Sequence, residues 1–213
     1  MTGLLVSVPI ACWRKGLARE YLETEDVPPP ATCYGFLLSL VGETDRRRHL
    51  GCRVTAGLLS CTHKSVVLRT VWRVKKTPLG SPGNTRPDYQ QLLSGIELII
   101  WLDSGQESSG APRLEDRAAQ ALDPARRGAL TRFGGLSLGE STHLVDSITR
   151  FHPTNSPANA NRLFLTNPQG RLTLPVWVDH VGSKHTRYCV GDLVETDLAP
   201  PDPARMPQIL APN

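Results

Sequence analysis

The stretch from Trp13 to Glu43 reads WRKGLAREYLETEDVPPPATCYGFLLSLVGE and contains the clearest local signals in the chain. Its three consecutive prolines cannot lie inside a helix, because proline lacks an N–H and clashes with the preceding turn. The last of them, Pro30, can occupy the first helical position, where its missing donor costs nothing. Apolar residues then recur with helical spacing from Cys33 to Val41, and Gly42 supplies a stop. The stretch therefore predicts an extended loop followed by a buried amphipathic helix over about 31–41.

Apolar runs on either side of this stretch predict several strands and a second helix. A strand over 4–8 precedes the loop and ends at Pro9. A helix over 114–122 ends before Pro124. Further strands are expected at 53–61, 66–76, 96–102, 143–148, 163–166, 171–178 and 187–194. The order of elements in the first 150 residues is close to the split βαβ or ferredoxin-like pattern, which predicts an α+β fold.

The run over 66–76 alternates strictly, so its side chains divide between two faces. One face carries three cations, Arg69, Arg73 and Lys75, in a row that suits a phosphate backbone. A solvated outer face explains this row equally well. The opposite face is largely apolar and is expected to pack in the core. It consists of Val66, Leu68, Thr70, Trp72 and Val74.

The segment 76–87 is rich in proline and glycine and has no apolar periodicity. It contains two more cations, Lys76 and Arg86. It can be a simple loop, and it becomes the tip of a long hairpin if the strands on either side of it pair.

Aromatic and basic side chains are interleaved in the loop before the first helix, as Trp13, Arg14, Lys15, Arg19 and Tyr21. Proteins hold single-stranded RNA in this way, since unpaired bases stack on aromatic rings while cations bind the phosphates. The alternative is a surface loop with one or two aromatic residues, Tyr21 in particular, packed in the core.

Two polar residues, Thr32 and Tyr34, follow at the start of the predicted helix, where the helix dipole favours an anion. Thr32 could equally be an ordinary helix cap.

A glycine-rich turn over 133–139 contains GLSLG, which has the GxSxG spacing of a hydrolase nucleophile elbow. Such an elbow needs a buried strand before it and a helix after it, and here arginines precede it and a strand-like run follows. A phosphate-binding P-loop is excluded, because no Gly-Lys-Ser/Thr follows. Backbone N–H groups of glycines can still approach phosphates. We therefore favour contact with an RNA backbone over a plain tight turn, involving Arg132, Gly134, Gly135 and Ser141.

The composition indicates a folded cytoplasmic protein without cofactor or metal. The 213 residues suffice for one good-sized core, and the net charge of +4 is mild. The five cysteines form no CxxC pair, so Cys52, Cys61 and His63 are a weak zinc candidate. The short apolar run at the start precedes its basic residues, unlike a secretory signal, and no run is long enough to cross a membrane.

Three groups of residues give the chain a family resemblance. The carrying residues are Trp13-Arg14, Ala18-Arg19-Glu20-Tyr21, Thr24, Pro28-Pro29-Pro30-Ala31-Thr32, Tyr34-Gly35 and Leu40-Val41-Gly42, then Thr85-Arg86-Pro87, Tyr89-Gln90, Leu92-Leu93 and 96–102, then Leu136 to Ser141. In this order they resemble the fifth CRISPR-associated (Cas) protein family, and most closely its DevS-type branch. The match covers most of residues 1–148 and is weak over the last sixty.

The resemblance implies a domain of the RAMP superfamily, similar to an RNA-recognition (RRM) or ferredoxin-like fold. It implies an RRM-like domain over 1–150, with an extended β-hairpin, the thumb, over about 66–102. A small β-rich annex is expected over 151–198, and an extended proline-rich tail over 199–213.

The resemblance also implies a function. Members of this family are subunits of type I Cascade ribonucleoprotein complexes in antiviral defence, or in transposon-associated systems. They bind the 5′ handle of the CRISPR RNA, cap the filament of backbone subunits and help to dock the large subunit that reads the PAM. Target DNA is reached only through the complex. The thumb, at about 75–87, is expected to lie across the guide and against the adjacent backbone subunit.

Two other functions stay open. Some relatives are metal-independent endoribonucleases that cut the precursor RNA, which requires a base and a cation. The neighbours His63-Lys64 and Lys184-His185 offer these groups, but adjacent side chains on a strand point to opposite faces, so no catalytic residue is predicted. The other function is that of a generic RRM-like protein that binds single-stranded RNA.

Overall fold

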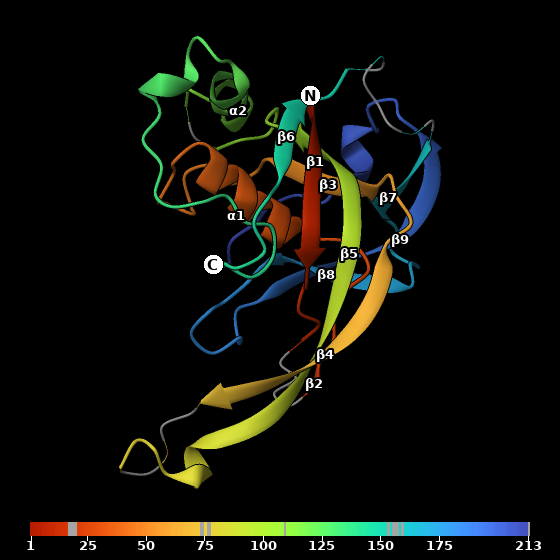
Figure 1. Cartoon of the computed structure of the whole chain (residues 1–213). Coiled ribbons are helices and arrows are strands. Elements are labelled where there is room, and N and C mark those ends of the chain that lie inside the picture. Colours follow the sequence, from red (N-terminus) through yellow and green to blue (C-terminus); the bar gives the residue numbers. More distant parts are fainter. Residues whose placement is uncertain are drawn as a thin grey trace.

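The computed structural model of the chain describes residues 1–16, 21–72, 75, 78–108, 110–152, 154, 158 and 160–212. Its described strands belong to one largely antiparallel sheet, in the order β6-β1-β5-β3-β7-β9-β8, with β2 and β4 paired to β5 outside this path (Figure 1). The elements are β1 (Thr2–Ala11), β2 (Tyr21–Leu22), α1 (Pro30–Leu40), β3 (Arg53–Leu58), β4 (His63–Trp72), β5 (Thr85–Asp103), α2 (Leu114–Leu122), β6 (Ser147–Arg150), β7 (Ala160–Thr166), β8 (Leu172–Trp177) and β9 (Arg187–Asp197). Single 3-10 turns lie at Pro82–Asn84, Arg127–Ala129 and Pro203–Arg205.

The centre of the sheet is the second half of β5, which pairs antiparallel with β1 on one side and β3 on the other. The run from Leu98 to Leu102 is buried on both faces. Alternation sends Leu98, Ile100 and Leu102 into the main core beneath the helices, and Ile99 and Trp101 into a smaller core with Leu163 and Met206. Burial on both faces explains why residues 98–102 form a continuous apolar run and do not alternate between apolar and polar residues.

The helix α1 begins and ends close to the predicted residues. Pro30 is its first residue, and Gly42 follows it with φ +67°, which confirms the predicted stop. More of the helix is buried than one face of an amphipathic pattern requires, because α2 and β8 pack against it as well as β3. Its buried residues are Pro30, Cys33, Tyr34, Phe36, Leu37, Leu38 and Leu40.

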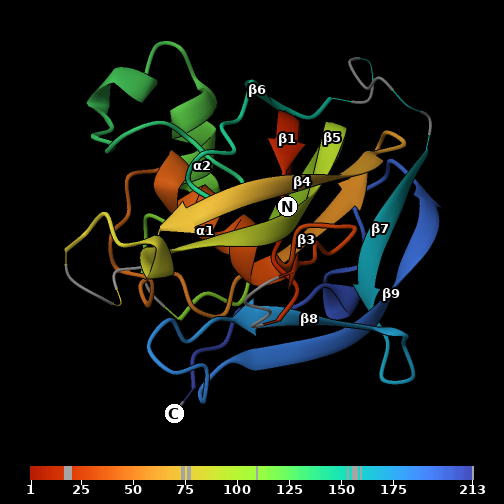
Figure 2. The ribbon, with the colours of Figure 1, turned by 60° about the horizontal axis from the view of Figure 1, so that its bottom comes forward.

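The first half of β5 leaves the body and pairs with β4 over its whole length, from His63 opposite Ser94 to Trp72 opposite Thr85. Figure 1 shows this hairpin extending from the sheet away from both helices, and in Figure 2 the hairpin comes forward, in front of α1. No layer of the described structure covers its outer side, so the prediction that the Val66 face packs in the core is wrong. Val66, Leu68 and Trp72 are 51%, 64% and 63% exposed, and Thr70 is exposed with them; Val74 lies outside the described residues.

The strands β7, β9 and β8 continue the main sheet, since β7 pairs with β3 at Gly57 and Leu58. The division into an RRM-like domain and an annex stays a prediction. The tail beyond Pro200 runs back along β3 and hydrogen-bonds to it, with Val54 N donating to Pro207 O and Ile209 N to Cys52 O. The strand expected at 143–148 is instead a tight turn followed by β6, because His143 binds back to the preceding segment.

Candidate nucleic-acid interface

The residues after β1 form a short ribbon with residues 23–25, which fixes the direction of each side chain. Glu25 N donates to Trp13 O at 2.8 Å, and Trp13 N donates to Thr24 Oγ1 at 3.0 Å. Trp13 points inward and is 1% exposed, while Arg14 points outward with 54% of its side chain exposed. The prediction that Trp13 stacks on a base is therefore wrong, since its ring is an anchor in the core and its Nε1 donates to Leu138 O at 3.3 Å.

The glycine-rich segment (residues 134–139) lies directly against this ribbon. Gly139 has φ +120°, and a Cβ atom there would be 3.0 Å from Cys12 O and 3.4 Å from the Trp13 ring. Leu138 is fully buried, and its N–H donates to His143 O at 3.1 Å. The segment is therefore held by the ribbon and by a tight turn over 140–143.

His143 closes that turn through its ring. Its Nδ1 accepts from Cys12 N at 3.2 Å and from Glu140 N at 3.1 Å, so the ring proton is on Nε2. Burial lowers the pKa of His143, with a smaller opposing effect from Glu140. A neutral histidine thus joins the end of β1 to the glycine-rich segment, and it is structural in its contacts.

Three of the predicted RNA-binding regions meet at one carboxylate, that of Glu140. Arg14 Nε of the ribbon lies 3.9 Å from Glu140 Oε1, and Arg69 Nη1 of β4 lies 3.8 Å from Glu140 Oε2. The ribbon, the hairpin and the glycine-rich segment therefore bring two guanidinium groups to one partly exposed point.

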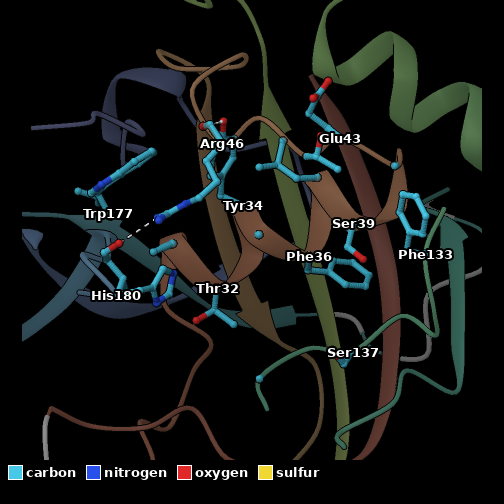
Figure 3. Close-up of a pocket in the computed structure, with 18 residues that line it drawn as sticks. Thr32, Tyr34, Phe36, Ser39, Glu43, Arg46, Phe133, Ser137, Trp177 and His180 are labelled. Atoms are coloured by element: carbon cyan, nitrogen blue, oxygen red, sulfur yellow. Dashed lines mark hydrogen bonds between the residues drawn. The ribbon is translucent and has the colours of Figure 1, made fainter. Parts of the chain in front are cut away.

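A groove runs from this point over the outer side of α1. Two adjoining cavities of about 560 and 500 Å³ share Thr32, Gly139, Val178 and His180 in their walls. Figure 3 shows the second, with Thr32 and Ser39 on α1, Phe133 and Ser137 on one side, and Trp177 and His180 on the other. Gly35 opens this side of the helix, since nothing would lie within 4 Å of a Cβ there.

The far wall of the groove is stiffened by Arg46. Its guanidinium lies 4.1 Å from the centre of the Trp177 ring, and its Nη2 donates to Val178 O at 3.0 Å (Figure 3). Tyr34 is 3% exposed and its hydroxyl donates to Arg46 O at 2.8 Å. Tyr34 therefore supports the wall mainly from inside, although it also lines the second cavity. Thr32 lines both cavities, and contact of either residue with RNA stays a prediction.

Aromatic residues are exposed on the hairpin and on β2 beside it. Tyr21 of β2 and Tyr89 of β5 lie with ring centres 6.2 Å apart and are 42% and 48% exposed. Tyr21 is therefore outside the core, against the alternative reading. Trp72 is exposed as well, farther toward the hairpin tip, where it lies opposite Thr85.

The other predicted contacts are not gathered at one point. Arg86 pairs with the buried Asp88 at 3.0 Å, and Lys75 N donates to Asn84 Oδ1 at 2.8 Å near the hairpin tip. Lys15 is exposed on the ribbon beyond Arg14. Arg19, Arg73 and Lys76 lie outside the described residues. Arg132, Gly134, Gly135 and Ser141 are exposed around the glycine-rich segment.

Several groups of the site were missed from the sequence, namely Glu140, His143, Tyr89, Trp177 and His180. Tyr89 could have been found, because alternation in residues 85–95 continues past Pro87. Glu140 and His143 carry no local signal, since their roles come from contacts with the end of β1.

The hydrolase reading finds no support in the geometry. Ser137 forms an isolated bridge with Leu144 and does not stand at a strand-to-helix turn. Lys64 of the first His-Lys pair binds Asp26 at 2.8 Å, and the second pair lies exposed in the loop after β8. Among the described residues, no three His, Cys, Asp or Glu side chains are placed to hold a metal ion. No helix in the described part of the chain is long and apolar enough to cross a membrane.

Comparison with known proteins gives the family. No family model matches the chain. CRISPR-associated protein Cas5 of Myxococcus xanthus (strain DK1622) is 54% identical over 211 residues, covering 98% of this chain and 97% of that relative. Two solved structures are similar at 14% identity: a chain of a CRISPR RNA-guided surveillance complex, with a TM-score of 0.59 over 92% of this chain and 89% of that one, and a structure described as a Cas protein, with a TM-score of 0.50 over 97% of each. With a relative this similar over nearly its full length, the chain belongs to the Cas5 family of CRISPR-associated proteins.

Proposed function

We propose that this chain is a subunit of a type I CRISPR Cascade effector and that it binds the 5′ handle of the CRISPR RNA. The observation that carries the proposal is the meeting of Arg14 and Arg69 at the mouth of the groove over α1. Phosphate contacts of this kind fix the register of a nucleic acid, and the groove offers space for unpaired nucleotides beside them. The similar fold of a chain from an RNA-guided surveillance complex supports the assignment.

The hairpin supplies the second part of the proposal. Its exposed apolar side, with Val66, Leu68 and Trp72, suits a protein partner, because a soluble chain rarely leaves such a row uncovered. We assign this side to the adjacent backbone subunit, so that this chain caps the filament, and the large subunit docks nearby. The complex reads target DNA by base pairing of its guide.

We further propose that the chain is not catalytic and that a separate ribonuclease processes the precursor RNA. Metal-free cleavage needs a base and a cation that converge on one 2′-hydroxyl. The first His-Lys pair lies at the start of β4 and the second in the loop between β8 and β9, and His143 uses its Nδ1 for two backbone bonds.

The test is to copurify RNA with the tagged protein from cells that express its neighbouring genes and a CRISPR array. Recovery of guides with one fixed 5′ end, together with the backbone subunit, is expected. Loss of guide RNA with Arg14→Ala/Arg69→Ala, but not with the distant control Arg126→Ala, would assign the interface. Recovery of no guide RNA by the unaltered protein would overturn the proposal.

The same preparation tests catalysis. Cells that lack the other ribonuclease gene should yield no mature guides. Mature guides in those cells, or cleavage of repeat RNA by the purified protein without metal, would make this chain the endoribonuclease.

A further inference from the structure

We propose that the carboxylate of Glu140 occupies the position of an RNA phosphate, and that a phosphodiester displaces it when the guide binds. The proposal rests on the proposed function, and it states which group the RNA phosphate replaces beside the two arginines. Arg14, Arg69 and Glu140 together are called the anion seat.

The distances in the anion seat favour an exchangeable ligand. Charged hydrogen bonds between arginine and a carboxylate are normally 2.7–2.9 Å long. Here the two nitrogen–oxygen distances are 3.9 Å to Arg14 and 3.8 Å to Arg69, so Glu140 satisfies the charge of both groups without a close bond to either. One carboxylate oxygen faces each guanidinium, as the two free oxygens of a phosphodiester could.

An unused donor points to the same conclusion. Arg69 Nε is buried and has no hydrogen-bond partner among the described residues. A buried donor without a partner is costly, so a shift of the guanidinium toward a closer acceptor would relieve that cost. A tetrahedral phosphate offers more acceptor positions than the planar carboxylate, and it carries the same single negative charge.

The surrounding groups leave this role to Glu140. Asp88, opposite Arg69 in the hairpin, is already paired with Arg86 at 3.0 Å. His143 beside the seat is kept neutral by burial, so it does not offset the carboxylate. In the described part of the chain, no other carboxylate lies within 4 Å of either Arg14 or Arg69.

The backbone of the seat is fixed while the Glu140 side chain is free to leave. Glu140 N donates to His143 Nδ1, and Glu140 O accepts from His143 N at 2.9 Å. The Glu140 side chain is 25% exposed at the edge of the groove. A change of side-chain rotamer is therefore enough to vacate the seat.

The variant Glu140→Gln tests the exchange, because it keeps the shape of the side chain and removes its charge. Its affinity for a fluorescent single-stranded handle RNA, measured by anisotropy, should rise about two- to fivefold, the size expected from one partly exposed ion pair. The slope of log affinity against log salt should steepen by up to about one. Glu23→Gln, an exposed neighbour on the same ribbon, controls for a general change in net charge.

Inorganic phosphate tests the seat without RNA. Added phosphate should raise the melting temperature of Glu140→Gln more than that of the unaltered protein, and Glu140→Gln/Arg69→Gln should lose this gain. Weaker RNA binding by Glu140→Gln, or an effect equal to that of Glu23→Gln, would overturn the exchange and leave Glu140 as a support for the arginines. If no form binds handle RNA but the phosphate gain is present, the seat stands and the proposed function fails.

Discussion

At the scale of single residues, the positions of Arg14 and Glu140 depend on buried side chains that hold the backbone on either side of the site. Trp13 and His143 are both buried, and each bonds across from the end of β1 to the glycine-rich segment. They place Arg14 and Glu140 side by side. Replacing either one therefore moves the site indirectly, and the effect should appear first in stability.

His143 makes stability depend on pH. Its pKa is lowered in the folded chain, mainly by burial, whereas the unfolded value is about 6.5. The unfolded chain therefore takes up the proton first, so this contribution is complete above about pH 6.5 and decreases as the pH falls toward the folded pKa.

We expect the difference in unfolding free energy between the unaltered protein and His143→Asn to shrink between pH 7 and pH 5. Asparagine keeps an acceptor near the position of Nδ1 and does not titrate. Urea unfolding at each pH measures the difference. A difference that does not change with pH would contradict the assignment.

Gly139 and Gly134 form a matched pair. Both have positive φ, +120° and +68°, but only Gly139 lies against other atoms, with Cys12 O 3.0 Å from a built Cβ. Gly134→Ala should cost about 1 kcal/mol for its backbone, and Gly139→Ala at least about 2 kcal/mol, because strain and crowding add. Thermal unfolding compares the two, and equal losses would show that the close packing is unimportant.

At the scale of elements, a buried polar network joins α2 to the loop before β3. Glu107 accepts from Leu114 N at 3.0 Å at the start of α2 and bonds His49 Nδ1 at 2.9 Å. Burial raises the pKa of Glu107, but its hydrogen bonds from His49, Ser104 and Leu114 outweigh this and lower it. The network thus fixes α2 beside α1.

Glu107→Gln should reduce the free energy of unfolding by about 2–4 kcal/mol near neutral pH, because it removes the charge that these donors bind. The loss should decrease as the pH falls below about 4.5, where the carboxylate of the unfolded chain takes up a proton. Denaturant unfolding at pH 7 and pH 4 checks both statements. Asp123→Asn, at the exposed end of the same helix, is the control and should cost little.

In the hairpin, by contrast, we expect substitution of an apolar residue to have little effect on stability. Leu68 is 64% exposed, so Leu68→Ser should change the free energy of unfolding by less than about 0.5 kcal/mol. Ile100→Ala, in the buried half of β5, should cost about 2–5 kcal/mol. Copurification of the backbone subunit should fall with Leu68→Ser although the protein stays folded. Undiminished copurification would remove this side of the hairpin from the proposed contact.

At the scale of the whole molecule, long-range placement is what the sequence leaves open. Local rules located α1 and its stop, α2 and the main strands, since these depend on proline, glycine and apolar spacing. The faces of β4 were assigned wrongly, because alternation gives two faces without saying which one a core covers. Only residues 96–102 of β5 were predicted as a strand, so its first half, which pairs with β4, was missed. The anion seat needs three segments that only the fold brings together.

The charge of the assembled interface can be measured through its salt dependence. Arg14→Ala/Arg69→Ala should lower the affinity for handle RNA and reduce the salt slope by up to about two, one for each lost phosphate contact. Arg126→Ala, which lies far from the seat and pairs with Asp123, should leave the slope unchanged. An unchanged slope in the double variant would place both arginines away from the RNA backbone.

The length of the hairpin can change without affecting the core of the protein. On the tip side of Asp88, which lies opposite Arg69 of the anion seat, residues of β5 pair only with β4, so the core does not depend on how far the two strands continue. Two residues inserted in each strand keep every side chain on its face and carry the tip about 7 Å farther out. The reach of the hairpin can therefore be changed by insertion without redesigning the sheet and helices that carry the proposed RNA interface.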